Sequence, residues 1–214
     1  ARLAASGFRF LEVHAAHGYL IHSFYSPISN NRTDGYGGDR TGRMRFALEV
    51  AESVRANWPE ELPLSFRISS VDAVDGGWDL QDSVVLAREL KSRGVDIIDC
   101  SSRGVGAANS LARLEKEGKA LEEGYQVPYS AHVRKTVPIP TMAVGLITRP
   151  EFAENALKQE SADMIALGRE LLYNPHWVLH AAHTLESDSR WEDWPPSWNW
   201  WLEKREKLGI KRAD

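Results

Sequence analysis

The sequence predicts an α/β fold with parallel strands, a (β/α)8 barrel of which about the last five βα units lie in this chain. Three observations support this prediction. Five short apolar runs alternate with stretches of helical periodicity. No G-x-G-x-x-G segment joins a strand to its helix, which argues against a dinucleotide-binding sheet. Polar or glycine-containing segments follow the strands repeatedly, and barrel enzymes place their active sites at that end.

The predicted elements alternate along the chain. The strands cover residues 8–14, 64–68, 95–100, 141–144 and 163–167, and the helices cover residues 43–58, 80–93, 129–136, 152–158 and 176–185. Residues 2–7 read as the last turn of a helix that Gly7 closes, as Gly94 closes a later one. Because a gene product rarely starts in such a turn and five units cannot close an eight-stranded barrel, we expect further residues before Ala1.

The composition indicates a globular chain with one sizeable core. Of the 214 residues, 43% are hydrophobic and 26% are charged. The net charge of -4 gives nucleic acids and anionic membranes no general attraction, so small-molecule partners are favoured. No apolar run is long enough to cross a membrane. The single cysteine, Cys100, excludes an intrachain disulfide, suits a reducing cytoplasmic compartment and is expected to be a small buried residue.

Residues 189–214 form a tryptophan-rich tail, which we expect to be distinct from the barrel part at residues 1–188. Five of the eight tryptophans lie between Trp191 and Trp201, around the pair Pro195 and Pro196 that blocks a helix. Two interpretations stay open. The tail either covers a surface of a partner or folds onto its own barrel.

The segment at residues 13–38, VHAAHGYLIHSFYSPISNNRTDGYGG, is the most informative for chemistry. His14 and His17 lie at a strand end, three residues apart, and Tyr19 follows two residues later. Spacing alone leaves three roles open for the imidazoles, namely metal ligands, core histidines and donors to an oxygen atom. A metal site needs a third ligand that this spacing does not supply, so we predict no metal.

Two motifs resemble the Old Yellow Enzyme family, namely H-A-A-H-G-Y-L and S-P-x-S-N-x-R-x-D-x-Y-G-G. The resemblance is nearer to the bacterial thermophilic-like class, because His17 stands where other members have Asn. It continues in family order through the strand around Arg67 and the segments DIIDCSS, GYQVP, AVGLIT and ALGRELL. It implies an ene-reductase with FMN as cofactor, NADPH or NADH as reductant, and an activated alkene, an α,β-unsaturated carbonyl or nitro compound, as substrate.

The resemblance also implies roles for individual residues. His14 and His17 would donate hydrogen bonds to the carbonyl or nitro oxygen, while reduced FMN gives hydride from N5 to the β-carbon. Tyr19 would protonate the α-carbon from the opposite side, with a purely packing role as the alternative.

Further positions match the cofactor side of the family. Arg67 would contact the flavin near N1 and O2, the alternative being an ion pair with a barrel carboxylate. Gln126 matches a position at the flavin edge. Gly145, Gly168 and Arg169 follow the last two strands, where barrels of this kind hold a phosphate.

Other polar residues are expected to be structural. A hydrogen-bonded loop that supports the histidines would contain Asn30, Arg32, Asp34 and Tyr36. We expect His180 and His183 to lie on a solvated helix face, and we assign no role to His22 or His132.

In thermophilic-like members a C-terminal arginine or tryptophan enters the active site of the neighbouring subunit. The tail lacks the arginine pattern, so Trp201 is the candidate here, and we expect a homo-oligomer. Two other functions stay open. One is a truncated chain that binds FMN weakly or not at all and pairs with a second copy through open strand edges. The other is a metal hydrolase that uses His14 and His17.

Overall fold

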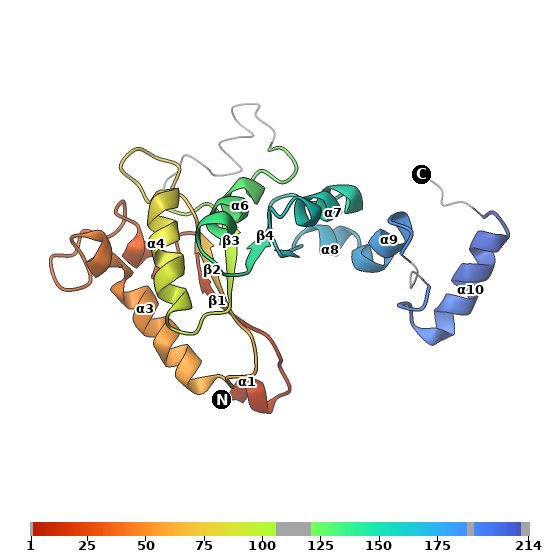
Figure 1. Ribbon diagram of the computed structural model, residues 1–214, viewed down its shortest axis with the longest axis horizontal. Helices are drawn as coiled ribbons and strands as arrows, with labels where there is room; N and C mark the ends of the chain where they lie inside the picture. The colour runs from red at the N-terminus through yellow and green to blue at the C-terminus, as the bar shows by residue number, and fades with distance from the viewer. Residues whose placement is uncertain (1, 106–120, 188–190, 211–214) are drawn as a thin grey trace. The chain divides into compact units, whose positions relative to one another are not determined.

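The computed structural model describes residues 2–105, 121–187 and 191–210 (Figure 1). Parts of the predicted tryptophan-rich tail lie outside these residues. The elements in chain order are α1 (Arg2–Ala5), β1 (Leu11–Ala15), α2 (Leu20–Tyr25), α3 (Arg40–Asn57), β2 (Leu64–Ser69), α4 (Leu80–Lys91), β3 (Ile97–Ser101), α6 (Val127–Thr136), β4 (Thr141–Ala143), α7 (Pro150–Lys158), β5 (Met164–Ile165), α8 (Glu170–Tyr173), α9 (Trp177–Thr184) and α10 (Pro196–Lys207).

The chain divides into two compact units. The first comprises Ala1–Leu146 and Ala156–Ala166, and the second comprises Ile147–Asn155 and Leu167–Asp214. The first unit contains a five-stranded sheet in the order β1-β2-β3-β4-β5, and every neighbouring pair is parallel. Strand order follows chain order, and helices connect the strands. The predicted parallel βα arrangement is therefore confirmed.

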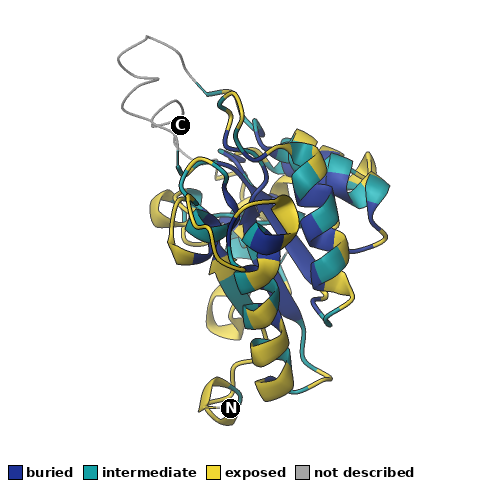
Figure 2. Cartoon of the chain, turned by 90° about the vertical axis from the view of Figure 1, so that its left-hand side faces the viewer, coloured by how far each residue is buried: buried dark blue, intermediate teal, exposed yellow. Residues whose placement is uncertain are grey.

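The two faces of this sheet differ in chemistry. Phe66, Ile68 and Cys100 are fully buried and share one hydrophobic core with apolar residues of α3, α4 and α6. Figure 2 shows dark blue strands behind helices whose outer surfaces are yellow. Because side chains alternate along a strand, the residues between these apolar ones point to the other face. His14, Arg67, Asp99, Met142 and Met164 lie at one level of that face.

Local sequence signals explain where the main helices begin. Asp39 caps α3 by accepting a hydrogen bond from the backbone N–H of Gly42 at 2.8 Å. Asp79 and Asp82 form a capping box at the start of α4. Gly94, with a φ of +82°, follows the end of α4 and turns the chain toward β3.

Several predicted boundaries were wrong. The strand expected at residues 8–14 begins only at Leu11, because its partner β2 begins at Leu64, and Phe8 and Phe10 are exposed instead. The strand expected at residues 163–167 shrinks to Met164–Ile165, since β4 offers only two partners. The other predicted bounds agree with the structure within three residues.

The second unit contains α8, α9 and the tryptophan-rich segment. Trp177 donates from Nε1 to Thr148 O at 2.7 Å. Buried Trp194 packs against His180 at a ring distance of 5.5 Å, and His180 also contacts Asn174 Oδ1 at 2.9 Å. The predicted solvated position of His180 was therefore wrong, whereas His183 is exposed as expected. Pro196 does not prevent a helix but begins α10, because proline is tolerated in a first turn.

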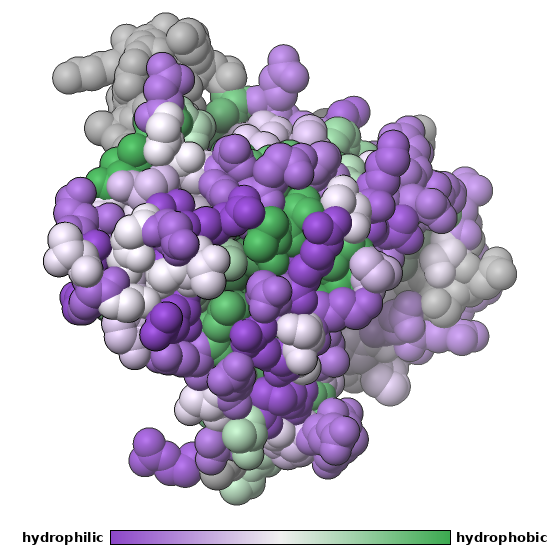
Figure 3. Space-filling view, turned by 60° about the vertical axis from the view of Figure 1, so that its left-hand side comes forward, coloured by the Kyte–Doolittle hydropathy of each residue, from purple (hydrophilic) through white to green (hydrophobic). Residues whose placement is uncertain are grey.

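The visible surface is mostly hydrophilic. Figure 3, turned so that the side of α3 comes forward, is mainly purple with small green areas. Within the described ranges, no helix combines the length and apolar character needed to cross a bilayer.

Candidate active site

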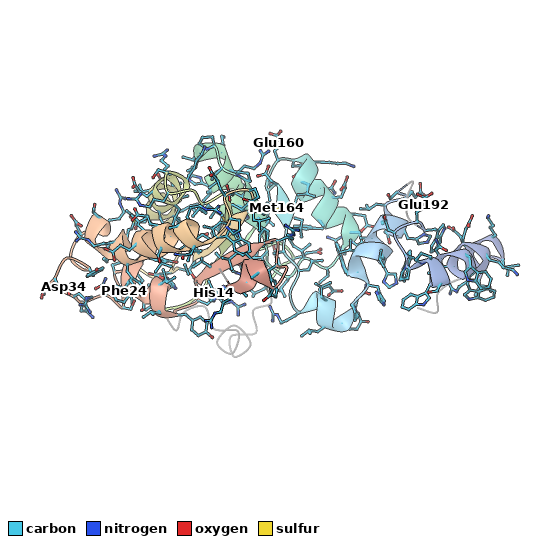
Figure 4. The ribbon with its side chains drawn as sticks, turned by 90° about the horizontal axis from the view of Figure 1, so that it is seen from below. His14, Phe24, Asp34, Glu160, Met164 and Glu192 are labelled. Carbon is cyan, nitrogen blue, oxygen red and sulfur yellow. The ribbon has the colours of Figure 1, made fainter. Side chains whose placement is uncertain are left out.

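His14, His17 and Tyr19 lie together where β1 leads into α2. Figure 4 labels His14 at this place. The ring centroids of His14 and His17 are 5.0 Å apart, and those of His14 and Tyr19 are 5.5 Å apart. His17 has a φ of +60° and Gly18 a φ of +79°, so the chain turns sharply between strand and helix. This segment, His17 to Tyr19, is called the histidine turn below. The turn brings the three predicted catalytic side chains into one cluster.

Arg67 is the neighbour of His14 in the sheet. The register pairs Arg67 with His14 on one side and with Asp99 on the other. Its Nε lies 3.5 Å from Asp99 Oδ2 and 3.4 Å from Ser101 Oγ. The contact with a barrel carboxyl group that was considered as an alternative is therefore present, and it is formed through Nε. The two terminal amino groups have no hydrogen-bond partner among the described residues, and they remain available as donors.

The hydroxyl of Ser101 connects His17 to Arg67. Ser101 Oγ lies 2.9 Å from His17 Nε2 and donates to Ile68 O at 3.0 Å. In this arrangement the hydroxyl oxygen accepts from the Nε2–H of His17, because its own proton is used. The backbone N–H of His17 donates to Ser69 Oγ at 2.9 Å. Serines of β2 and β3 thus hold His17 at both its backbone and its ring.

The surroundings keep both imidazoles neutral at pH 7. Burial lowers the pKa of His14, and the charge of Arg67 lowers it further, against an opposite effect of Glu12. Burial also lowers the pKa of His17 to about 4, again assisted by Arg67. The sequence left the charge state open. The structure favours neutral rings with one N–H each, and in the observed arrangement the N–H of His17 is the one that Ser101 accepts.

Asp99 is a buried carboxyl on this polar face. It is only 1% exposed, and its Oδ1 has no hydrogen-bond partner in the described part of the chain. Burial raises the pKa of Asp99 to about 7; the charge of Arg67 opposes this rise, and the charge of Glu12 adds to it. An ionised group in such surroundings loses its hydration, so Asp99 holds its proton up to nearly neutral pH. Sequence reasoning missed this residue, although an Asp inside an apolar strand was the available signal.

Gln126 and Gly145 come together after β3 and β4. A Cβ atom on Gly145 would lie 3.2 Å from both Cβ and the backbone N of Gln126. Gln126 is buried, and its Oε1 accepts from Ser102 N at 2.9 Å. Its Nε2 has no hydrogen-bond partner among the described residues. The absence of a side chain at Gly145 permits this approach, and within the described part of the chain the Gln126 amide keeps a donor without a partner.

Gly168, Arg169 and Trp201 belong to the second unit. Gly168 and Arg169 follow β5 in the sequence and are exposed, and Arg169 is the N-cap residue of the short helix α8. Trp201 lies on α10 and is 45% exposed. The roles of these three residues stay predictions of the sequence.

A buried network supports the histidine turn, and its central residue, His22, had been assigned no role. His22 Nδ1 accepts from Gly18 N at 2.8 Å, and His22 Nε2 lies 2.9 Å from Asp72 Oδ1. Asp72 Oδ2 also accepts from Ser26 Oγ at 2.6 Å and from Trp78 N at 2.8 Å. Burial raises the pKa of Asp72, but these hydrogen bonds outweigh burial and hold the pKa below its usual value.

The loop after α2 is hydrogen-bonded as predicted. Asn30 Nδ2 donates to Tyr36 O at 2.7 Å, and Arg32 forms an ion pair with Asp34. The hydrogen bond from Arg32 lowers the pKa of Asp34 to about 2. Figure 4 places Asp34 away from His14. These contacts stabilise the loop itself.

Metal ligation was one of the open roles for the histidines. Over the described residues, no group of three or more His, Cys, Asp or Glu side chains is arranged to hold a metal ion.

Curated relatives match most of this chain. It is 43% identical over 188 residues to the NADPH dehydrogenase of Bacillus velezensis, covering 88% of this chain and 52% of that protein. It is 41% identical over 188 residues to the NADPH dehydrogenase of Bacillus subtilis, with the same coverage. The chain thus spans about half the length of the curated relatives it matches.

Solved structures share the fold. The old yellow enzyme homologue from Zymomonas mobilis matches with a TM-score of 0.64 and 26% identity, over 86% of this chain and 48% of that one. A 2-naphthoyl-CoA reductase matches with a TM-score of 0.74 and 23% identity, over 85% of this chain and 27% of that one, which shows a common fold. The sheet is accordingly part of a (β/α)8 barrel.

The predicted resemblance to Old Yellow Enzyme is confirmed at the level of the family. The sequence model of the NADH:flavin oxidoreductase / NADH oxidase family matches residues 1–188. We conclude that the chain belongs to the NADH:flavin oxidoreductase / NADH oxidase family.

Proposed function

We propose that this chain carries the substrate-binding residues of an FMN-dependent NAD(P)H oxidoreductase that reduces the C=C bond of α,β-unsaturated carbonyl or nitro compounds. The observation that carries the proposal is the grouping of His14, His17 and Arg67 at the carboxyl end of the sheet, where Ser101 connects His17 to Arg67. Neutral donors beside a fixed cation suit an oxygen that gains negative charge. The names of the two Bacillus relatives favour NADPH as reductant, with NADH as the alternative.

The free donors of the first unit fit a flavin. Among the described residues, neither the two terminal amino groups of Arg67 nor the amide N–H groups of Gln126, beside Gly145, have a hydrogen-bond partner. Arg67 and Gln126 would hold the isoalloxazine ring, and the phosphate is assigned to Gly145, Gly168 and Arg169 from their places in the sequence after the last two strands. The chemistry that FMN supplies when bound is transfer of hydride from NAD(P)H to an alkene carbon.

His14 and His17 would hold the substrate oxygen and draw electron density from the β-carbon. Their lowered pKa values make them neutral donors that need no counter-ion. His17 can donate from Nδ1 once Ser101 turns its hydroxyl from Ile68 O toward Nε2, since the ring proton then lies on Nδ1. Donors held at this position stabilise the charge that develops on the oxygen.

Tyr19 would deliver the proton. As a C–H bond forms at the β-carbon, the Tyr19 hydroxyl proton moves to the α-carbon, and the carbonyl or nitro group regains its neutral form. An enolate is basic enough to take a phenolic proton. Tyr19 is 65% exposed, so water can return the proton to the phenolate.

We further propose that the protein is a homo-oligomer and that Trp201 contacts a neighbouring subunit. Exposed Trp198, Trp200 and Trp201 lie on α10 and line a cavity of about 390 Å³. Large exposed aromatic groups commonly mark contact surfaces. Trp201→Ala is expected to lower the oligomer mass in solution, and an unchanged mass would contradict this assignment.

The test of the proposed function is an anaerobic titration of the purified protein. NADPH is expected to bleach the visible flavin absorbance, and an enone is expected to restore it. Protein that stays colourless after FMN is added would overturn the proposal. That result would favour the truncated chain that associates through open strand edges, since β1 and β5 each pair on one side only in the described sheet.

A further inference from the structure

We propose that His22 is a positioning residue that holds the histidine turn in place by accepting a hydrogen bond from the backbone of Gly18. The inference rests on the proposed function, because it concerns the two side chains that flank Gly18. His22 does not face the substrate, being fully buried between the turn and Asp72. It would therefore act through the backbone.

The hydrogen bonds determine which nitrogen of His22 carries the proton. A backbone N–H can only donate, so Nδ1 of His22 must be the unprotonated nitrogen that accepts from Gly18. Nε2 then carries the proton and donates it to Asp72 Oδ1 at 2.9 Å. Asp72 is in turn held by Ser26 and by the backbone of Trp78. An anchored carboxylate thus orients the ring, and the ring orients the turn.

The turn needs such support because its backbone is strained. His17, with a φ of +60°, is not a glycine, and a side chain at its Cβ makes this left-handed conformation unfavourable. A Cβ atom on Gly18 would lie 3.0 Å from Gly104 O, and one on Gly104 would overlap the His22 ring. The backbone at residue 104 and the ring of His22 are therefore packed closely around the turn. A strained turn persists only where its surroundings determine it.

The support reaches both proposed substrate-contacting groups at once. Gly18 lies between His17, which would hold the oxygen, and Tyr19, which would supply the proton. If the Gly18 hydrogen bond is lost, both side chains shift relative to His14, whose ring lies 5.0 Å from that of His17 and 5.5 Å from that of Tyr19. His22 thereby controls the spacing of the oxygen-binding and proton-donating groups.

Two substitutions separate positioning from simple packing. His22→Asn places an amide oxygen where Nδ1 was and keeps the acceptor for Gly18, but it cannot reach Asp72. His22→Gln places an amide nitrogen where Nε2 was and keeps the donor to Asp72, but it offers no acceptor to Gly18. If His22 only fills space, His22→Asn should be the more damaging substitution, because it leaves the larger cavity. If His22 positions the turn, His22→Gln should be the more damaging one.

Two measurements on the full chain distinguish a positioning role of His22 from a packing role. NMR titration is expected to show His17 neutral down to about pH 5 in wild type and His22→Asn, and protonating at higher pH in His22→Gln. The kcat/KM for a cyclic enone is expected to fall about tenfold in His22→Gln and less than about threefold in His22→Asn. The proposal would be overturned if the two variants gave the same His17 titration and the same kcat/KM, or if their order in these measurements followed their thermal stability.

The NMR readout needs no alkene turnover, so it decides on His22 even if the proposed function fails. If neither variant folds, the ring nitrogen shifts of wild-type His22 provide the test. A proton on Nε2 with a slowly exchanging Gly18 amide is expected, and a proton on Nδ1 would refute the role.

Discussion

The ring nitrogen Nε2 of His17 lies 2.9 Å from the hydroxyl oxygen of Ser101. A hydroxyl both donates and accepts, so Ser101 can serve either neutral tautomer of His17. When it donates to Ile68 O, the His17 proton is on Nε2; when it donates to His17, the proton is on Nδ1. Ser101 therefore decides whether His17 presents a donor or an acceptor toward a substrate oxygen.

Removing this hydroxyl should weaken binding of the alkene oxygen. Ser101→Ala is expected to raise the KM for an enone about tenfold, the value of one hydrogen bond. Ser65→Ala is the matched control, since Ser65, on β2, lies on the same face of the sheet but donates to Glu12. Steady-state kinetics with both variants checks this. Equal KM values in the two variants would speak against the assignment of Ser101.

Tyr19 is expected to act only in the alkene half of the reaction. Tyr19→Phe should slow enone reduction about a hundredfold or more, as loss of a general acid does. Reduction by NADPH should not change, and stability should stay near that of wild type because the side chain is exposed. Stopped-flow measurement of each half-reaction tests this, with Tyr36→Phe as control. A loss confined to the NADPH half would refute the role.

Asp99 should make stability depend on pH. Its folded pKa of about 7 lies above the usual value, so the folded state binds its proton more tightly than the unfolded chain. Its contribution to stability is therefore complete below about pH 4 and is lost as pH rises toward 7, at about 1.4 kcal/mol per pKa unit. Asp99→Asn should consequently gain stability relative to wild type between pH 5 and pH 8. Urea unfolding of wild type and Asp99→Asn at pH 5 and pH 8 measures the difference in their free energies of unfolding. A difference that does not change with pH would contradict this pKa.

The sequence predicted the parts of the site that depend on local pattern. His14, His17 and Tyr19 lie within six residues, so any turn at the end of β1 keeps them close. The pairing of His14 with Arg67 follows from strand register, which alternating βα units indicate only approximately.

The supporting residues could not be predicted in this way. The contact between His22 and Asp72 spans 50 residues and requires the loop after β2 to fold back under α2. The Ser101 contact spans 84 residues and depends on the relative positions of β1 and β3. Hydrogen bonds of this kind arise from tertiary packing, and no spacing in the sequence encodes them.

The contribution of His14 and His17 is measured most directly by comparing how fast an enone and dioxygen reoxidise the reduced protein. The variant carrying His14→Ala and His17→Ala should react with the enone at least about a hundredfold more slowly than wild type, while its reaction with dioxygen changes little, because only the enone oxygen needs both donors. An enone rate equal to that of wild type would show that these imidazoles do not activate the alkene.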